Sequence, residues 1–157
     1  MSQEQTREEL LAEFEAASAA LLAVLPRFTE EQWFAAERND GWRVHDIVAH
    51  ISDSNYALAL MALGQLTPPR PLNEQTGWMD DIDSINQERR EKNASLPREK
   101  VLDRTNKALA QVRSAIEQIE DLDGPGPFGP QITRRQILQR IVRHINEHCS
   151  ELEELLK

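Results

Sequence analysis

Four segments of the chain place apolar residues three and four positions apart, which is the spacing of one stripe along an α-helix. They cover residues 6–25, 44–63, 80–120, and the stretch from Thr133 to the C-terminus. Such stripes are buried when helices pack against one another. The pattern therefore predicts an all-α protein, built as an up-and-down four-helix bundle.

Proline and glycine mark where these helices end. Pro26 stops the first helix, and Pro97 is expected to bend the third. A short turn capped by Thr29 should follow the first helix. The proline-containing connection 65–82 is longer than a helix hairpin requires, so it could cover a pocket. Alternating Gly and Pro over residues 123–130 predict a loop.

Composition and charge limit the fold, the partners and the cellular compartment that we expect. The chain has 157 residues and only 6 Gly and 8 Pro, which fits a single helical domain over 1–157. Its net charge of −9 disfavours nucleic acid and anionic membranes as partners. Cys149 is the only cysteine, which excludes an internal disulfide and suits a reducing compartment. With no export signal or membrane span in the pattern, we expect a cytoplasmic protein.

Two histidines on the last predicted helix are the first candidates for chemistry. His144 and His148 are four residues apart, so they differ by about 40° around the helix and can bind one ion. The apolar stripe through Ile141 and Ile145 turns both toward the bundle interior. Histidines at this spacing can equally be hydrogen-bonded packing residues, so the pair by itself leaves metal binding open.

A third histidine strengthens the metal hypothesis. His50 lies in the middle of the second predicted helix, between Ala49 and Ile51, and can also face inward. Three neutral imidazoles bind Zn²⁺, Ni²⁺ or Fe²⁺ and leave a position open for water or substrate. An open position favours catalysis over a purely structural role.

Several polar residues near these histidines are not expected to bind the metal themselves. Asp46, Asp53 and Glu147 could orient an imidazole, although solvated carboxylates are the expectation for each. His45 lies about 140° from His50 around the helix, so we expect it at the surface or in the first turn of the helix. Cys149 is expected to be a buried structural thiol.

The histidines lie within motifs that identify a family resemblance. The segments GWRVHDIVAHI at 41–51 and HINEH at 144–148 resemble the DinB-like metalloprotein superfamily, and the similarity spans nearly the whole chain. That superfamily folds as a four-helix bundle. It carries a Trp before the second helix, a His near the middle of that helix and an HxxxH pair on the last. The resemblance assigns these positions to Trp42, His50, His144 and His148, with the three histidines as metal ligands.

The resemblance also implies a reaction class. The superfamily includes the metal-binding domains of mycothiol-dependent maleylpyruvate isomerases. The leading hypothesis is a thiol S-transferase-like enzyme that uses a divalent metal, Zn or Ni before Fe, and a thiol such as mycothiol or bacillithiol. Isomerisation and hydrolysis are less favoured reactions. The competing hypotheses are a non-catalytic stress or resistance protein that binds a metal or toxic small molecule, and a helical dimer whose histidines never meet. The long apolar stripes suit a homodimer.

Overall fold

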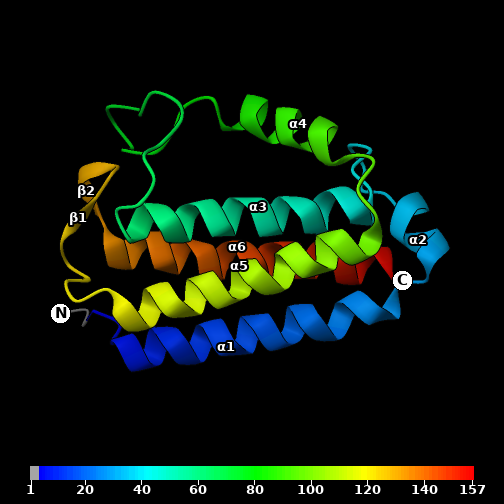
Figure 1. The fold of residues 1–157 in the computed structure, drawn as a ribbon, viewed down its shortest axis with the longest axis horizontal. Helices are drawn as coiled ribbons and strands as arrows, with labels where there is room; N and C mark the ends of the chain where they lie inside the picture. The colour runs from blue at the N-terminus through cyan, green and yellow to red at the C-terminus, as the bar shows by residue number, and fades with distance from the viewer. Residues whose placement is uncertain (1–3) are drawn as a thin grey trace.

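The computed structural model describes residues 4–157, so the first three residues of the N-terminal segment in which we expected no export signal lie outside it. The all-α prediction is confirmed by six α-helices, a 3₁₀ turn and one small hairpin (Figure 1). In chain order they are α1 (Arg7–Val24), the 3₁₀ turn (Leu25–Arg27), α2 (Glu30–Ala35), α3 (Val44–Ala62), α4 (Ile82–Asn93), α5 (Arg98–Gln118), β1 (Pro125–Gly126), β2 (Gly129–Thr133) and α6 (Arg134–Leu155).

The four long helices α1, α3, α5 and α6 form the bundle. Helix α3 packs against α5 and α6, and α1 packs against the same two helices. Figure 1 shows α3 and α5 running in the same direction, because α4 carries the chain back along the outside of the bundle. Directions therefore do not simply alternate as in an up-and-down bundle, and α4 is free to lie over α3 rather than within the bundle.

Threonine side chains begin three of the helices. Thr6, Thr29 and Thr133 each accept a hydrogen bond from a backbone N–H in the first turn of α1, α2 and α6. Gln32 and Gln136 return the contact by accepting from the N–H of Thr29 and Thr133. The short turn expected at Thr29 is thus confirmed as the capped start of α2.

The core lies along the common axis of the long helices. Each contributes side chains that are buried on the faces predicted from the apolar stripes. Among them are Leu10, Phe14 and Leu21 on α1, Ile47 and Ile51 on α3, Val112 and Ile116 on α5, and Ile137, Ile141 and Ile145 on α6. The apolar period thus placed the bundle helices correctly, since burial follows it on all four.

The third predicted helical region is two separate helices. Helix α4 ends at Asn93, and Pro97 is the N-cap of α5 with extended backbone angles. A proline disfavours the helical conformation of the residue that precedes it. The chain therefore leaves the helix before Pro97 and turns, instead of continuing as one bent helix. The predicted loop at 123–130 also needs correction, because it contains a short antiparallel ribbon. Gly129, with φ of 87°, makes the tight return that pairs it with Gly126.

Within the described residues, every helix is too short or too polar to span a bilayer. The cytoplasmic location and the homodimer stay predictions. Leu22, Tyr56 and Leu66 are the large apolar side chains exposed on the surface.

Of the two positions expected for His45, the first turn of the helix is correct and the surface is wrong. Its side chain is 0% exposed, because α2 and α4 pack over the start of α3. The indole Nε1 of Trp33 donates to His45 Nδ1 at 3.0 Å, so His45 Nε2 carries the proton and donates to the carbonyl oxygen of Asn93 at 2.9 Å. His45 therefore ties α2 and α4 to α3. Apolar spacing along one helix could not reveal this, since the two partners come from the two short helices.

We expect His45→Ala to lower the free energy of unfolding by about 2–4 kcal/mol, since it leaves a cavity and two buried polar groups without partners. Urea unfolding followed by tryptophan fluorescence measures this change. His45→Gln, whose amide can still donate to the Asn93 carbonyl, should lose less. Equal stability of His45→Ala and the unaltered protein would contradict the bridging role.

Candidate metal centre

Three histidines predicted from the sequence come together between α3 and α6. His50 projects from the middle of α3, and His144 and His148 project from successive turns of α6. The Nε2 atom of His144 lies 3.0 Å from Nε2 of His50 and 2.9 Å from Nε2 of His148. One potential ligand atom from each ring lies within 4.8 Å of the other two. The three residues therefore form a single cluster.

The outer nitrogen, Nδ1, of each histidine contacts a side-chain oxygen. The pairs are His50 with Ser54 Oγ at 3.2 Å, His144 with Asn55 Oδ1 at 3.2 Å, and His148 with Glu151 Oε2 at 2.5 Å. Asn55 Oδ1 and Glu151 Oε2 can only accept, so they fix the proton on Nδ1 of His144 and His148 and leave each Nε2 with a free lone pair, and Ser54 Oγ can accept from His50 in the same way. Three such lone pairs facing one point repel each other unless a cation lies between them. The donor set therefore fits a divalent metal.

The protonation of the cluster also suits metal binding. Burial, followed by the charges of the neighbouring histidines, lowers the pKa of His50 to about 2. Burial and the neighbouring His148 lower the pKa of His144 to about 3. Both rings are therefore neutral near pH 7, which is the form of imidazole that coordinates a metal.

The carboxylates considered as orienting groups lie elsewhere. Asp46 is only 3% exposed, so the expectation that it is solvated is wrong. It forms ion pairs with Arg43 at 3.2 Å and with Arg90 at 3.3 Å. Burial raises the pKa of Asp46, but hydrogen bonds from Arg43 and the charges of both arginines outweigh burial and hold it below its usual value. Asp53 accepts a hydrogen bond from Asn93 at 2.6 Å.

The remaining neighbours match their sequence interpretations. Glu147 is exposed, as expected of a solvated carboxylate. Cys149 is buried, and burial raises the pKa of its thiol, so it has the character of a structural residue rather than a nucleophile.

Sequence reasoning missed the actual orienting residues, Ser54, Asn55 and Glu151. Two of them carry a signal in their spacing, because Ser54 follows His50 by four residues and Glu151 follows His148 by three. Asn55 carries no such signal, since it contacts His144 across the interface between α3 and α6. Only the packing of these two helices shows its role.

Trp42 and Arg38 complete one side of the cluster. The Trp42 ring meets His50 edge-on, with ring centroids 5.6 Å apart. The guanidinium of Arg38 lies 5.2 Å from the centre of the Trp42 ring and donates to Glu151, with an Nη1 to Oε2 distance of 3.0 Å. Arg38 and Glu151 therefore link the Trp42 side of the site to His148.

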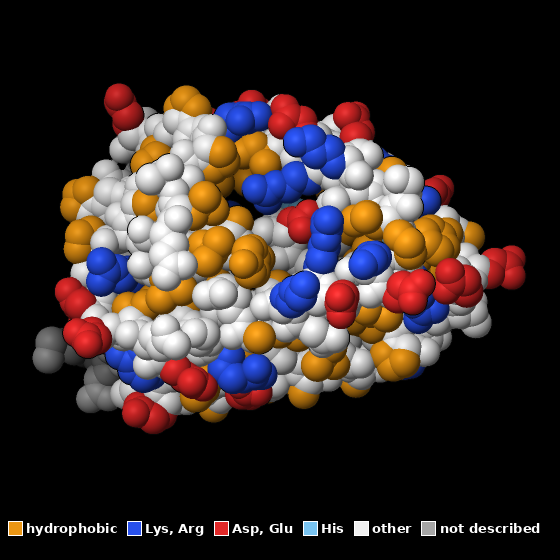
Figure 2. Space-filling view, in the orientation of Figure 1, with side chains coloured by type: hydrophobic (Ala, Val, Ile, Leu, Met, Phe, Trp, Pro, Cys, Tyr) orange, Lys and Arg blue, Asp and Glu red, His pale blue; other side chains and the backbone are white. Residues whose placement is uncertain are grey.

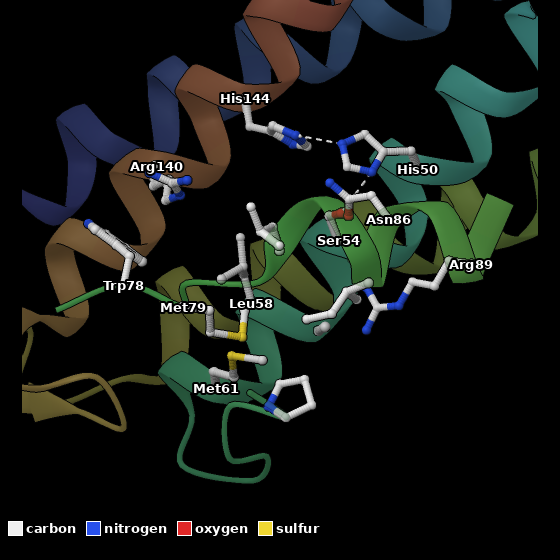
Figure 3. A pocket seen from close by; sticks show the side chains of 14 residues that line it. His50, Ser54, Leu58, Met61, Trp78, Met79, Asn86, Arg89, Arg140 and His144 are labelled. Atoms are coloured by element: carbon white, nitrogen blue, oxygen red, sulfur yellow. Dashed lines mark hydrogen bonds between the residues drawn. The ribbon is translucent and has the colours of Figure 1, made fainter. Parts of the chain in front are cut away.

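Two hollows reach the cluster. A cavity of about 200 Å³ lies between α3, α4, α6 and the connection over residues 63–81, with His50 and His144 in its wall (Figure 3). A second hollow, of about 510 Å³, is lined mostly by polar side chains and contains His50 and His148. On the face of the molecule seen in Figure 2, Lys and Arg side chains gather around a depression. The connection does help enclose a cavity, as its length suggested.

The comparison with protein families agrees with this geometry. The family model of the DinB superfamily matches residues 5–152, which is most of the chain. The chain belongs to the DinB superfamily. No curated protein and no solved structure gives a significant match. The resemblance inferred from the two histidine motifs is therefore confirmed, and the cluster of His50, His144 and His148 is compatible with the metal binding that is common in the DinB superfamily.

Proposed function

We propose that His50, His144 and His148 hold one divalent cation, and that this DinB-superfamily protein is an enzyme that transfers a low-molecular-weight thiol to a small electrophile. The convergence of three Nε2 atoms, each on a ring whose Nδ1 already contacts an oxygen, carries the proposal. Neutral imidazoles suit Zn²⁺ or Ni²⁺, with Fe²⁺ as a third candidate. Three protein ligands leave a position for an exogenous group.

The chain's own residues would bind and orient the reacting groups. His50, His144 and His148 would hold the cation, which would supply a lowered pKa to a bound thiol, so that the nucleophile would be a thiolate. The carboxylate of Glu151 holds His148 in one orientation, and Arg38 holds Glu151. Trp42 packs against the His50 ring and limits its rotation. These contacts keep the ligand geometry fixed before any substrate enters.

The two hollows supply separate places for two substrates. The larger hollow is lined by Arg38, Asp40, Asp83 and Gln87 beside His148, and such polar walls suit a hydroxyl-rich thiol of the mycothiol or bacillithiol type. The smaller cavity, of about 200 Å³, has mainly apolar walls and suits the electrophile. Because His50 lines both, a thiol and an electrophile bound in the two hollows would meet at the histidine cluster.

Metal analysis of protein purified without a histidine tag tests the ligand set. We expect about one bound divalent ion per chain in the unaltered protein, and a loss of affinity of more than about 100-fold in His148→Ala, since even residues behind a ligand contribute 10–100-fold. His45→Gln, altered at the one histidine outside the cluster, should keep its metal. Stoichiometric metal in His148→Ala would refute the three-histidine site.

A conjugation assay tests the reaction. The metal-loaded protein is incubated with 1-chloro-2,4-dinitrobenzene and with mycothiol, bacillithiol or cysteine in turn, and the thioether is measured by mass spectrometry. In the expected reaction a C–S bond forms, chloride leaves and the thiol proton passes to solvent. Conjugation should exceed that in EDTA-treated protein and in His148→Ala. If metal binds but none of the thiols is conjugated faster, the protein is a binding protein rather than a transferase.

A further inference from the structure

The apolar cavity beside the histidines has the size and walls of a small-molecule site. Its volume of about 200 Å³ is below the roughly 300–1,000 Å³ of pockets that bind drug-sized ligands, so its ligand is small. Most of its wall is apolar, from Leu58, Met61, Trp78, Met79, Ile82 and Ile85. His50 and His144 lie at one end, so a ligand that fills the cavity reaches the cluster (Figure 3).

Two arginines interrupt this apolar wall. Arg89 extends from α4 and Arg140 from α6, on different sides of the cavity in Figure 3. The Arg140 guanidinium lies over the face of Trp78, 4.4 Å from the ring centre, which holds it in place. On α6, Arg140 is one turn before His144, so the cation and the imidazole share one face of the helix.

Neither arginine has a carboxylate partner among residues 4–157. Eight other arginines each form an ion pair: Arg38, Arg43, Arg70, Arg90, Arg98, Arg104, Arg113 and Arg135. The remaining four also form none within that range, but Arg7 and Arg134 donate to backbone carbonyls. Arg27 and Arg143 are exposed to solvent, whereas Arg89 and Arg140 are half-buried. The contrast is informative because the chain has 27 acidic residues against 18 basic ones. Unpaired cations beside an apolar cavity are unfavourable unless an anion binds there.

A third polar group faces the same region. Asn86 lies on α4 one turn before Arg89 and lines both the cavity and the larger hollow. Its Oδ1 atom is buried and accepts no hydrogen bond from the described residues. Buried acceptors of this kind normally have a donor, so a ligand with a hydroxyl or N–H group would satisfy it.

We propose that the cavity binds a small carboxylate with an apolar body, and that the positive charges of Arg89 and Arg140 on its two sides attract the carboxylate group. A singly charged carboxylate fits better than a phosphate, because a second charge costs more to remove from water into a mainly apolar cavity. The inference rests on the proposed function, since it assigns the electrophile of that reaction to a chemical class. The electrophilic substrate is therefore an unsaturated or halogenated carboxylic acid or a similar reactive acid.

Binding measured without turnover tests this assignment. Metal-free protein is titrated with hexanoate, with the neutral analogue 1-hexanol, and with inorganic phosphate, and binding is followed by NMR chemical shifts. We expect hexanoate to bind at least about tenfold more tightly than 1-hexanol. Arg89→Gln and Arg140→Gln should each weaken hexanoate binding by about 10–100-fold and leave 1-hexanol binding unchanged.

Arg143→Gln is the matched control. It removes the same charge from the same helix as Arg140→Gln, but Arg143 is exposed and does not line the cavity. Its hexanoate affinity should change by less than about twofold. An equal loss in Arg143→Gln and Arg140→Gln, or phosphate binding as tight as hexanoate binding, would overturn the assignment.

The same titration with zinc-loaded protein separates this inference from the proposed function. Arg-dependent hexanoate binding in metal-free protein supports the carboxylate site even if the histidines bind no metal. Hexanoate binding that requires zinc and survives both Arg89→Gln and Arg140→Gln would mean that the metal binds the carboxylate. That result would refute the role of the arginines and leave the metal site intact.

Discussion

The hydrogen bonds at the outer nitrogens of three histidines are the interaction on which the candidate site depends. Ser54, Asn55 and Glu151 contact the Nδ1 atoms, so the Nε2 atoms face one another, with Nε2 of His144 3.0 Å from that of His50 and 2.9 Å from that of His148. Burial keeps the rings of His50 and His144 neutral by lowering the pKa of each. Three imidazoles that share one focus in this way are compatible with a divalent cation at that point.

The fold brings the three histidines together, and it differs in one respect from a bundle whose helix directions alternate. Helix α4 returns along the outside, which lets α3 and α5 run in the same direction and places α4 over α3 (Figure 1). His45 fixes this arrangement from within, since it forms hydrogen bonds with Trp33 on α2 and with Asn93 at the end of α4. The cavity then forms between α3, α4 and α6, directly beside the histidines. His45 thus stabilises the packing of the helices, whereas His50, His144 and His148 are the candidate metal ligands.

Much of the fold and of the candidate site could be predicted, because it depends on the spacing of apolar residues along single helices. The stripes through Leu21 and Ile145 place the long helices and turn His144 and His148 inward. The position of His50 on its helix makes it a possible third ligand, and the motif resemblance groups the three as one site. What could not be predicted depends on contacts between elements distant in the sequence. Spacing on α3 placed His45 at the surface or in the first turn, and it could not reveal the burial of the side chain, because it contains no information on α2 or α4. Asn55 reaches His144 only because α3 packs on α6. Asp46 likewise is buried by arginines from two different segments.

The central claim is that three imidazoles bind one ion at a common point. X-ray absorption spectroscopy at the zinc edge of zinc-loaded protein tests this most directly, because scattering from imidazole rings can be counted and distinguished from sulfur. The account predicts three imidazole ligands, with the remaining coordination filled by oxygen from solvent. A sulfur ligand from Cys149, or fewer than three imidazoles, would contradict it.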